Sequence, residues 1–164
     1  MIKLDNNTKV WITSDTHYNH TNICRGVTKW RMPDGSVPES QTRNFESLDK
    51  MNSAIVNNIN EVVGQDDVLI HLGDWSFGGF EQIEEFYNRL ICKNIHLVLG
   101  NHDHHIDRDR DNIRNKFLSV NWFEQFSYQG ETIETCHYPI ASWNGLRKGR
   151  VHLHGHCHLP NHKK

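Results

Sequence analysis

The sequence has no apolar run near the ~20 residues that a membrane-spanning helix requires. Its opening stretch, MIKLDNNTKVWITSD, also lacks the apolar core of a signal peptide. An excess of one charge is missing too, because 18 basic side chains stand against 20 acidic ones, for a formal charge of −2. Nucleic acids and anionic membranes are held by basic faces, so this balance gives no strong signal for either partner. We therefore expect a cytoplasmic protein that does not act on a membrane.

Cysteine pairing is a further absence. The chain has four cysteines at unrelated spacings and no C-x-x-C pair, which excludes a zinc ribbon and gives no disulfide framework. We expect a reducing compartment. The length of 164 residues suits one domain, over residues 1–164, that buries a core of its own. The oligomeric state is not predicted by any feature of the sequence.

Histidine, by contrast, is abundant. The chain contains 13 histidines, and they cluster beside aspartate, asparagine and glycine instead of spreading evenly. Segment 98–111, VLGNHDHHIDRDRD, is the densest example. Neutral imidazole is the commonest metal ligand in proteins, so metal binding is the first hypothesis.

The first half of the chain reads as alternating strands and helices. Short β-rich runs that end at polar residues or glycine predict buried strands at 10–13, 68–72 and 95–99. Apolar residues at helical spacing predict helices at 45–63, 80–92 and 113–118, with Asn44 as N-cap of the first. The second half changes to strands and turns and predicts antiparallel strands at 122–128, 132–136 and 150–153.

One connection, 18–43, is far longer than the ~4–6 residues usual between elements. It predicts a rim or lid over a site. It contains Trp30 among four cations, and an aromatic ring among cations can stack a base while its neighbours bind phosphate. An ordinary polar rim has the same composition, so both interpretations stay open.

Ligand-type side chains follow five predicted strands. Any one of them would usually be a turn or a hydrogen-bonded surface residue. Their repetition at carboxyl ends of strands, where ligands bind in α/β sheets, makes a shared site the better interpretation. Carboxylate, imidazole and one amide form a hard to borderline donor set, and seven ligands are enough for two ions. The candidates are Asp15 and His17, Asp74, Asn101, His137, and His156 with His158.

In this order, the stretches SDTHYNHTNI, HLGDWSF, GNHD, HYP and GHCH resemble the motif blocks of the calcineurin-like metallophosphoesterases. The likeness is strongest to the small single-domain type found in bacteria and phages, and it covers almost the whole chain. It implies an α/β fold, a four-layer α/β/β/α sandwich, with a dinuclear metal site at the carboxyl-end edge of the strands. Family members usually continue into a further strand after the last block, whereas only LPNHKK follows His158 here. Two expectations stay open: either this last element is truncated, or this protein functions without it.

The resemblance also implies roles. Asp15, His17 and His158 would hold one divalent ion; Asn101, His137 and His156 would hold the other; and Asp74 would bridge the two. His102 would be the catalytic group that gives a proton to the leaving oxygen. Manganese is the favoured metal, and iron, zinc, nickel or magnesium also suit the donor set. The implied reaction is hydrolysis of a phosphate ester by in-line attack of a hydroxide held between the ions.

Two residues near the motifs are expected to support the site without binding metal. Gly100 allows a close backbone approach, and Asp103 orients its neighbours. Asn19 stands where many similar sequences have glycine. Histidines without an assigned role are interpreted as structural or loop residues: His20, His104, His105 and His154.

The sequence leaves the substrate open, and no substrate-binding residue is assigned. We favour a phosphodiester of a nucleotide or cyclic nucleotide over a phosphomonoester of a small metabolite. A module that binds metal without catalysis is the alternative from another class, although such a protein would be expected to lose ligands, and all seven are present.

Overall fold

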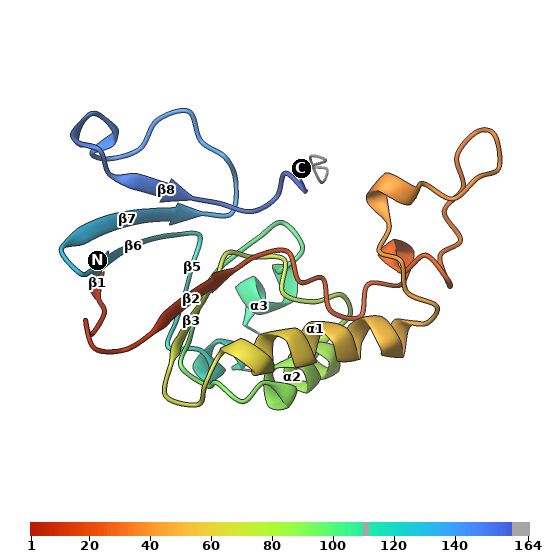
Figure 1. Ribbon diagram of the computed structural model, residues 1–164, viewed down its shortest axis with the longest axis horizontal. Coiled ribbons are helices and arrows are strands. Elements are labelled where there is room, and N and C mark those ends of the chain that lie inside the picture. Colours follow the sequence, from red (N-terminus) through yellow and green to blue (C-terminus); the bar gives the residue numbers. More distant parts are fainter. Residues whose placement is uncertain (110–111, 159–164) are drawn as a thin grey trace.

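The computed structural model describes residues 1–109 and 112–158, which form two four-stranded sheets (Figure 1). The first sheet is parallel throughout, in the order β2-β3-β4-β5. Its strands are β2 (Val10–Thr13), β3 (Val68–His71), β4 (Ile95–Val98) and β5 (Ser119–Asn121). The second sheet has the order β1-β6-β7-β8. Its strands are β1 (Ile2–Lys3), β6 (Phe123–Tyr128), β7 (Glu131–Cys136) and β8 (Val151–Leu153).

The second sheet is mixed, which corrects the prediction of antiparallel strands in this half. β6 and β7 pair antiparallel through the turn at Gln129 and Gly130, but β8 runs parallel to β7. The reason is the connection 137–150, which returns the chain to the starting end of β7 before β8 begins. β1 and β5, which were not predicted, are only two and three residues long and carry too little periodic signal.

The first two helices follow the prediction with shifted ends, and the third lies in a segment that was predicted as a loop. They are α1 (Leu48–Val62), α2 (Phe80–Arg89) and α3 (His104–Arg108), with short 3₁₀ turns at Thr21–Ile23, Glu39–Gln41, Ile113–Lys116 and Leu146–Lys148. The N-cap of α1 is Ser47, whose side chain accepts the backbone N–H of Lys50, and not Asn44. The predicted helix at 113–118 is one of the 3₁₀ turns. None of the helices in the described part of the chain is long and apolar enough to cross a membrane.

Two separate cores define the layers. Leu69 of β3 belongs to the core shared with the helices, and its neighbour Ile70 belongs to the core between the sheets. Phe126 of β6 meets Ile70 in this second core. Adjacent residues of a strand point to opposite faces, so the first sheet is covered on one side by helices and on the other by the second sheet.

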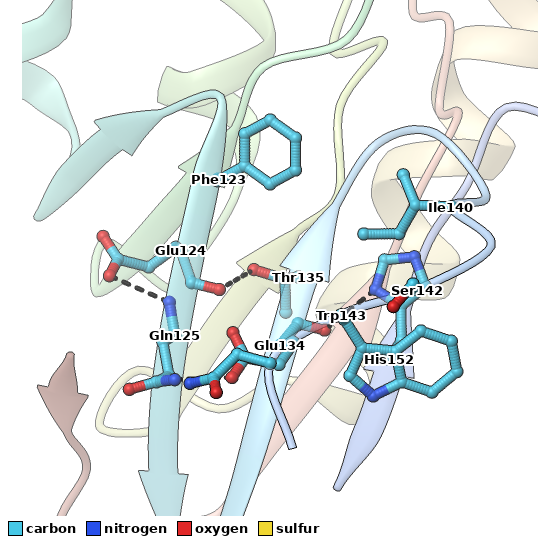
Figure 2. Close-up of a pocket in the computed structure, with 10 residues that line it drawn as sticks. Phe123, Glu124, Gln125, Glu134, Thr135, Ile140, Ser142, Trp143 and His152 are labelled. Atoms are coloured by element: carbon cyan, nitrogen blue, oxygen red, sulfur yellow. Dashed lines mark hydrogen bonds between the residues drawn. The ribbon is translucent and has the colours of Figure 1, made fainter. Parts of the chain in front are cut away.

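The fourth layer of the expected sandwich is not seen among residues 1–109 and 112–158. The outer face of the second sheet is covered instead by the connection 137–150, which carries one 3₁₀ turn at Leu146–Lys148. Figure 2 shows Trp143 and Ile140 of this connection over His152 of β8 and Glu134 of β7. The α/β class and the two-sheet sandwich are as expected.

One prediction concerns residues outside the described ones. The expected difference from the family after His158 falls on residues 159–164. The long connection 18–43 is described in full, and Figure 1 shows it as a lobe beyond the start of α1. Its two ends are joined by a β-bridge between Cys24 and Arg43.

Candidate metal centre

The candidate ligands lie directly after strands of both sheets. The parallel strands β2, β3 and β4 end at one edge, and they are followed by Asp15 and His17, by Asp74, and by Asn101. The second sheet adds His137 after β7 and the segment 156–158 after β8. The shared edge therefore brings together residues that are up to 143 positions apart in the chain.

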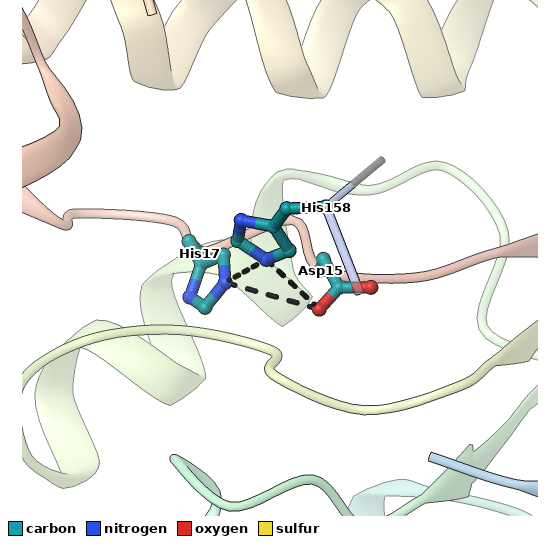
Figure 3. Close-up of side chains that lie close together, drawn as sticks. All are labelled: Asp15, His17 and His158. Atoms are coloured by element: carbon teal, nitrogen blue, oxygen red, sulfur yellow. Dashed lines mark hydrogen bonds and ion pairs between the residues drawn. The ribbon is translucent and has the colours of Figure 1, made fainter. Parts of the chain in front are cut away.

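Five of the seven candidates form two groups whose ligand atoms all lie within 4.8 Å of one another. One group is Asp15, His17 and His158 (Figure 3), and the other is Asp15, Asp74 and His137. Asp15 belongs to both groups, whereas the resemblance assigned it to one ion. Asp74 Oδ2 lies 3.6 Å from His17 Nε2 and 3.4 Å from His137 Nε2, so this carboxylate sits between the two groups.

Asn101 and His156 lie beside these groups in different ways. The side-chain oxygen of Asn101 is 3.1 Å from His137 Nε2. The exposed ring of His156 lies edge-on to the His137 ring at 5.1 Å, and its backbone N–H donates to the Asp15 carboxylate. The side chain of His156 is therefore near the second group without being part of it.

The donor set fits a divalent cation. The Nε2 atoms of His17 and His158 are 3.0 Å apart, and Asp15 Oδ1 lies 3.1 Å from the latter. His137 donates its Nδ1 proton to the carbonyl of Leu72 at 2.7 Å, so its neutral form turns a lone pair toward Asp74. A backbone carbonyl that fixes the tautomer in this way is usual behind a metal-binding histidine. So many acceptors at one place require positive charge between them.

The pKa values of the buried groups agree with this charge arrangement. Burial lowers the pKa of His17 to about 3, which keeps its ring neutral. Burial alone would raise the pKa of Asp74, but hydrogen bonds from His137 and the His102 backbone lower it to about 2. Burial likewise opposes charge on His137, yet its bonds to Asp74 and Leu72 raise its pKa, because a proton on Nε2 can satisfy the carboxylate.

Five candidate ligands have backbone conformations that L-residues rarely adopt. Their φ angles are positive and lie between 41° and 69°. A left-handed conformation costs a non-glycine residue roughly 1–2 kcal/mol, and such strain collects at functional sites. The loops after β2 and β8 each carry two of these residues, and the loop after β3 carries one. The residues are Asp15, His17, Asp74, His156 and His158. Asn19, at φ 65°, occupies a position of the same kind, which explains why glycine also suits it.

Glycines allow the loops to meet. A Cβ on Gly100 would lie 2.5 Å from the backbone nitrogen of Asp74 and closer still to its carboxylate, which confirms the expected close approach. A Cβ on Gly155 would collide with Ser14 and the Asp15 carboxylate. The loops after β3 and β4 are thus in direct backbone contact, and the loop after β8 packs its Gly155 against side chains of the loop after β2.

Asp103 orients its neighbours, as the sequence analysis expected. Its buried carboxylate accepts the backbone N–H groups of Asp74, Trp75 and Gly100 at 2.8 to 2.9 Å. Burial raises the pKa of Asp103 to about 6, against the effect of these three bonds. This one side chain therefore fixes the loop after β3 to the loop after β4.

Two supporting residues were missed by the sequence analysis. Buried His71, at the end of β3, accepts the Gly73 N–H on Nδ1, so its Nε2 donates to Thr16 at 2.9 Å. Burial lowers its pKa to about 4. Arg43, predicted only as part of a rim, donates to the backbone carbonyls of Asp15 and Thr16, both at 2.6 Å. The motif HLGD, which contains His71, was a signal in the sequence for this supporting role. No residue near Arg43 in the sequence indicated that Arg43 bonds the loop after β2.

The remaining histidines divide by position. His102 lies at the site, with its backbone N–H donating to Asp74 Oδ1 at 2.9 Å and its ring 4.6 Å from Phe77. The ring of His20 stacks on the same Phe77 ring, with 3.4 Å between the two ring centroids. The two histidines after Asp103 begin α3 instead of forming a loop, and they belong to neither ligand group among the described residues.

Comparisons with known proteins show the family to which this chain belongs. Residues 8–162 match the family model described as calcineurin-like phosphoesterase. An uncharacterized protein of Methanocaldococcus jannaschii is 28% identical over 156 residues, covering 94% of this chain and 71% of that protein. The Gene 66 protein of Mycobacterium phage D29 is 26% identical over 176 residues, covering 91% and 78% respectively.

One solved structure has a fold similar to that of this chain. The crystal structure of a protein of unknown function from Aquifex aeolicus has a TM-score of 0.64 and 23% identity, and the match covers 94% of this chain and 82% of that one. At this identity the likeness concerns the fold alone. The family model, in contrast, spans nearly the whole chain and all of the strand-end motifs. The chain therefore belongs to the calcineurin-like phosphoesterase family.

Proposed function

We propose that this chain is a divalent-metal-dependent phosphoesterase whose substrate is a phosphodiester of a nucleotide or cyclic nucleotide. The observation that carries the proposal is the convergence of acceptor atoms from Asp15, His17, Asp74, His137 and His158 at one sheet edge. Membership of a family of metallophosphoesterase hydrolases supports it. The protein's own residues must then hold the ions, place the ester and supply a proton.

The proposed ligand assignment keeps the first group and follows the family resemblance for the second ion. Asp15, His17 and His158 hold one ion, and His137 with Asn101 and His156 holds the other. Asp74 lies between them and is proposed to bind both, because its Oδ2 is within 3.6 Å of a histidine nitrogen of each group. Bound divalent ions in such a pair lower the pKa of a water molecule and neutralise phosphate oxygens. Manganese is the metal we favour for this mixed oxygen and nitrogen set.

His102 is proposed to donate the proton that the leaving oxygen requires. Its position supports this role, since its backbone bonds the central carboxylate while its ring is free of that bond and packs against Phe77. The His102 ring also lies 5.5 Å from the His17 ring, which places it at the border of the ligand group and outside it. Imidazole is the side chain that most often serves as a general acid in enzymes.

The test is turnover by protein that has been stripped with a chelator and reloaded with Mn²⁺. Nitrophenyl phosphate, bis(nitrophenyl) phosphate, a dinucleotide and a cyclic nucleotide are compared, and the stripped protein is the control. We expect metal-dependent hydrolysis with about two ions bound per chain, and faster turnover of diesters.

Each other outcome selects an alternative. Preference for the monoester would favour a phosphomonoesterase of small metabolites. Two bound ions without any turnover would favour a silent metal-binding module. Absence of metal binding would refute the proposal and the ligand assignment together.

A further inference from the structure

Two clefts border the long connection 18–43, and they share a wall made of Ile23 and Trp30. One has a volume of about 490 Å³ and the other about 560 Å³. Both lie within the range of ~300–1,000 Å³ that is usual for small-molecule sites. The side chain of Trp30 is 41% exposed, so part of the indole ring is open to a ligand.

The first cleft leads to the proposed metal ligands. Its far wall is the segment 156–158, and His158 from this wall contacts Asp15 at 3.1 Å. Its near wall includes Ser40 and Gln41, which are exposed. Neither side chain has a hydrogen-bond partner within residues 1–109 and 112–158. Both are thus available to bond the polar edges of a ligand.

The second cleft leads toward the proposed proton donor. It is lined by His20, whose ring stacks on Phe77 and lies 6.3 Å from the ring of His102. Lys29 also lines it, and no carboxylate in the described part of the chain forms an ion pair with this ammonium group. The second cleft therefore combines the ammonium group of Lys29 with a position beside His102, the proposed proton donor.

The shared wall is fixed to the ligand loop. Trp30 donates its backbone N–H to the hydroxyl of buried Thr28, and the backbone of Thr28 bonds the carbonyl of Cys24. Cys24 in turn pairs with Arg43, whose guanidinium holds the carbonyl of Asp15. This chain of contacts sets the position of Trp30 relative to the metal centre, so Trp30 can act as a fixed surface for part of a substrate.

We propose that the two clefts are subsites for the two arms of an open phosphodiester, and that a nucleobase on one arm stacks on Trp30. The inference rests on the proposed function, because it requires the phosphorus to lie at the metal centre. The retained nucleoside occupies the cleft beside His158, and the leaving alcohol occupies the cleft beside His20, where His102 can protonate it. A monoester or a cyclic nucleotide has one arm and fills one cleft, whereas an open diester fills both.

The decisive experiment compares two esters with the same leaving group, thymidine 5′-(4-nitrophenyl phosphate) and methyl 4-nitrophenyl phosphate. Both are assayed with the Mn²⁺-loaded parent and with Trp30→Ala. Stacking of a base on an aromatic side chain contributes ~1–3 kcal/mol, so the ratio of kcat/KM for the thymidine ester to that for the methyl ester should fall by roughly 5- to 150-fold. Most of this change should appear in KM.

Matched variants separate stacking from general damage. Trp122 is 42% exposed and lines neither cleft, so Trp122→Ala should keep the parental ratio. Trp30→Tyr retains a ring face and should keep most of the preference. If Trp30→Ala is unfolded by circular dichroism, Trp30→Leu replaces it, because leucine retains apolar volume without a ring face.

The outcomes distinguish this inference from the proposed function. No turnover of either ester overturns the proposed function, and the subsites with it. Turnover of both esters with an unchanged ratio in Trp30→Ala overturns the subsites alone. A dinucleotide should also be cleaved with a higher kcat/KM than 3′,5′-cyclic thymidine monophosphate, and the reverse order would overturn the assignment of two arms.

Discussion

Gly100→Ala should separate the metal ligands by a distance that can be worked out from the structure. The added Cβ would stand 2.5 Å from the backbone nitrogen of Asp74, whereas ordinary contact begins at 3.4 Å. The loops after β3 and β4 must therefore move apart by about 1 Å. Overpacking of this kind costs about 1–3 kcal/mol in free energy of unfolding. For a chain of this size that is a fall of roughly 2–12 °C in melting temperature.

The larger effect should fall on metal affinity. Asp74 is the carboxylate between the two ligand groups, and its position depends on its bonds to His102 and Asp103 of the loop after β4. Loss of a contact that orients a ligand typically weakens metal binding by 10- to 100-fold. Titration calorimetry with Mn²⁺ on chelator-stripped protein measures this directly.

Gly79→Ala is the matched control for this experiment. A Cβ at Gly79 meets no atom within 4 Å, and its φ of −93° is open to alanine. Gly79→Ala should therefore bind metal as the parent does. If Gly100→Ala also bound Mn²⁺ with parental affinity and melted at the parental temperature, the inferred contact between the two loops would be wrong.

Four further predictions concern single side chains. Asp74→Asn should weaken Mn²⁺ binding together with turnover, with partial recovery in excess metal. His102→Ala should keep its metal content while turnover falls ~10²–10⁴-fold, more for alkoxide than for nitrophenolate leaving groups; loss of metal by atomic absorption would contradict the assignment. His71 has a folded pKa of about 4 against 6.5, so the unfolded state binds more protons between these values. The free energy of unfolding should fall by about 3 kcal/mol as pH drops from 6.5 through 4. In urea titrations over this pH range, the free energy of unfolding of His71→Gln should fall less than that of the parent. Arg43→Ala should lower Mn²⁺ affinity by roughly 10- to 100-fold, with recovery on adding guanidinium ion; an unchanged affinity would make Arg43 a rim residue only.

The sequence predicted the first sheet well because its strands are short apolar runs that end abruptly. The prediction for 10–13 matches β2, and those for 68–72 and 95–99 each extend one residue beyond the strand. Ligand-type residues after these runs were predicted to meet, because parallel neighbours end at one edge. Asp15 and Asp74 do meet there, and His137 joins them from the end of β7 in the second sheet. Their roles toward metal stay predictions.

Other features depended on contacts between distant segments. Ser47 replaced Asn44 as the N-cap of α1, because either residue type can cap a helix and tertiary packing selects where the first turn begins. The direction of β8 was set by the path of the connection 137–150, which strand periodicity does not specify. The sequence pattern did not decide the outer helical layer either. Among the described residues, the connection 137–150 takes that place with a single 3₁₀ turn.

The sequence by itself determined which side chains are available for the chemistry and in what order they follow the strands. Side-chain type and strand-end position are local properties, so they can be read from adjacent letters. Only the tertiary structure decided their environment: the left-handed turns that aim Asp15 and His158 inward, the three N–H groups around Asp103, and the bond from Arg43 to the ligand loop. Burial, pKa and hydrogen-bond partners arise from residues far apart in the chain, and they exist only once the two sheets have packed.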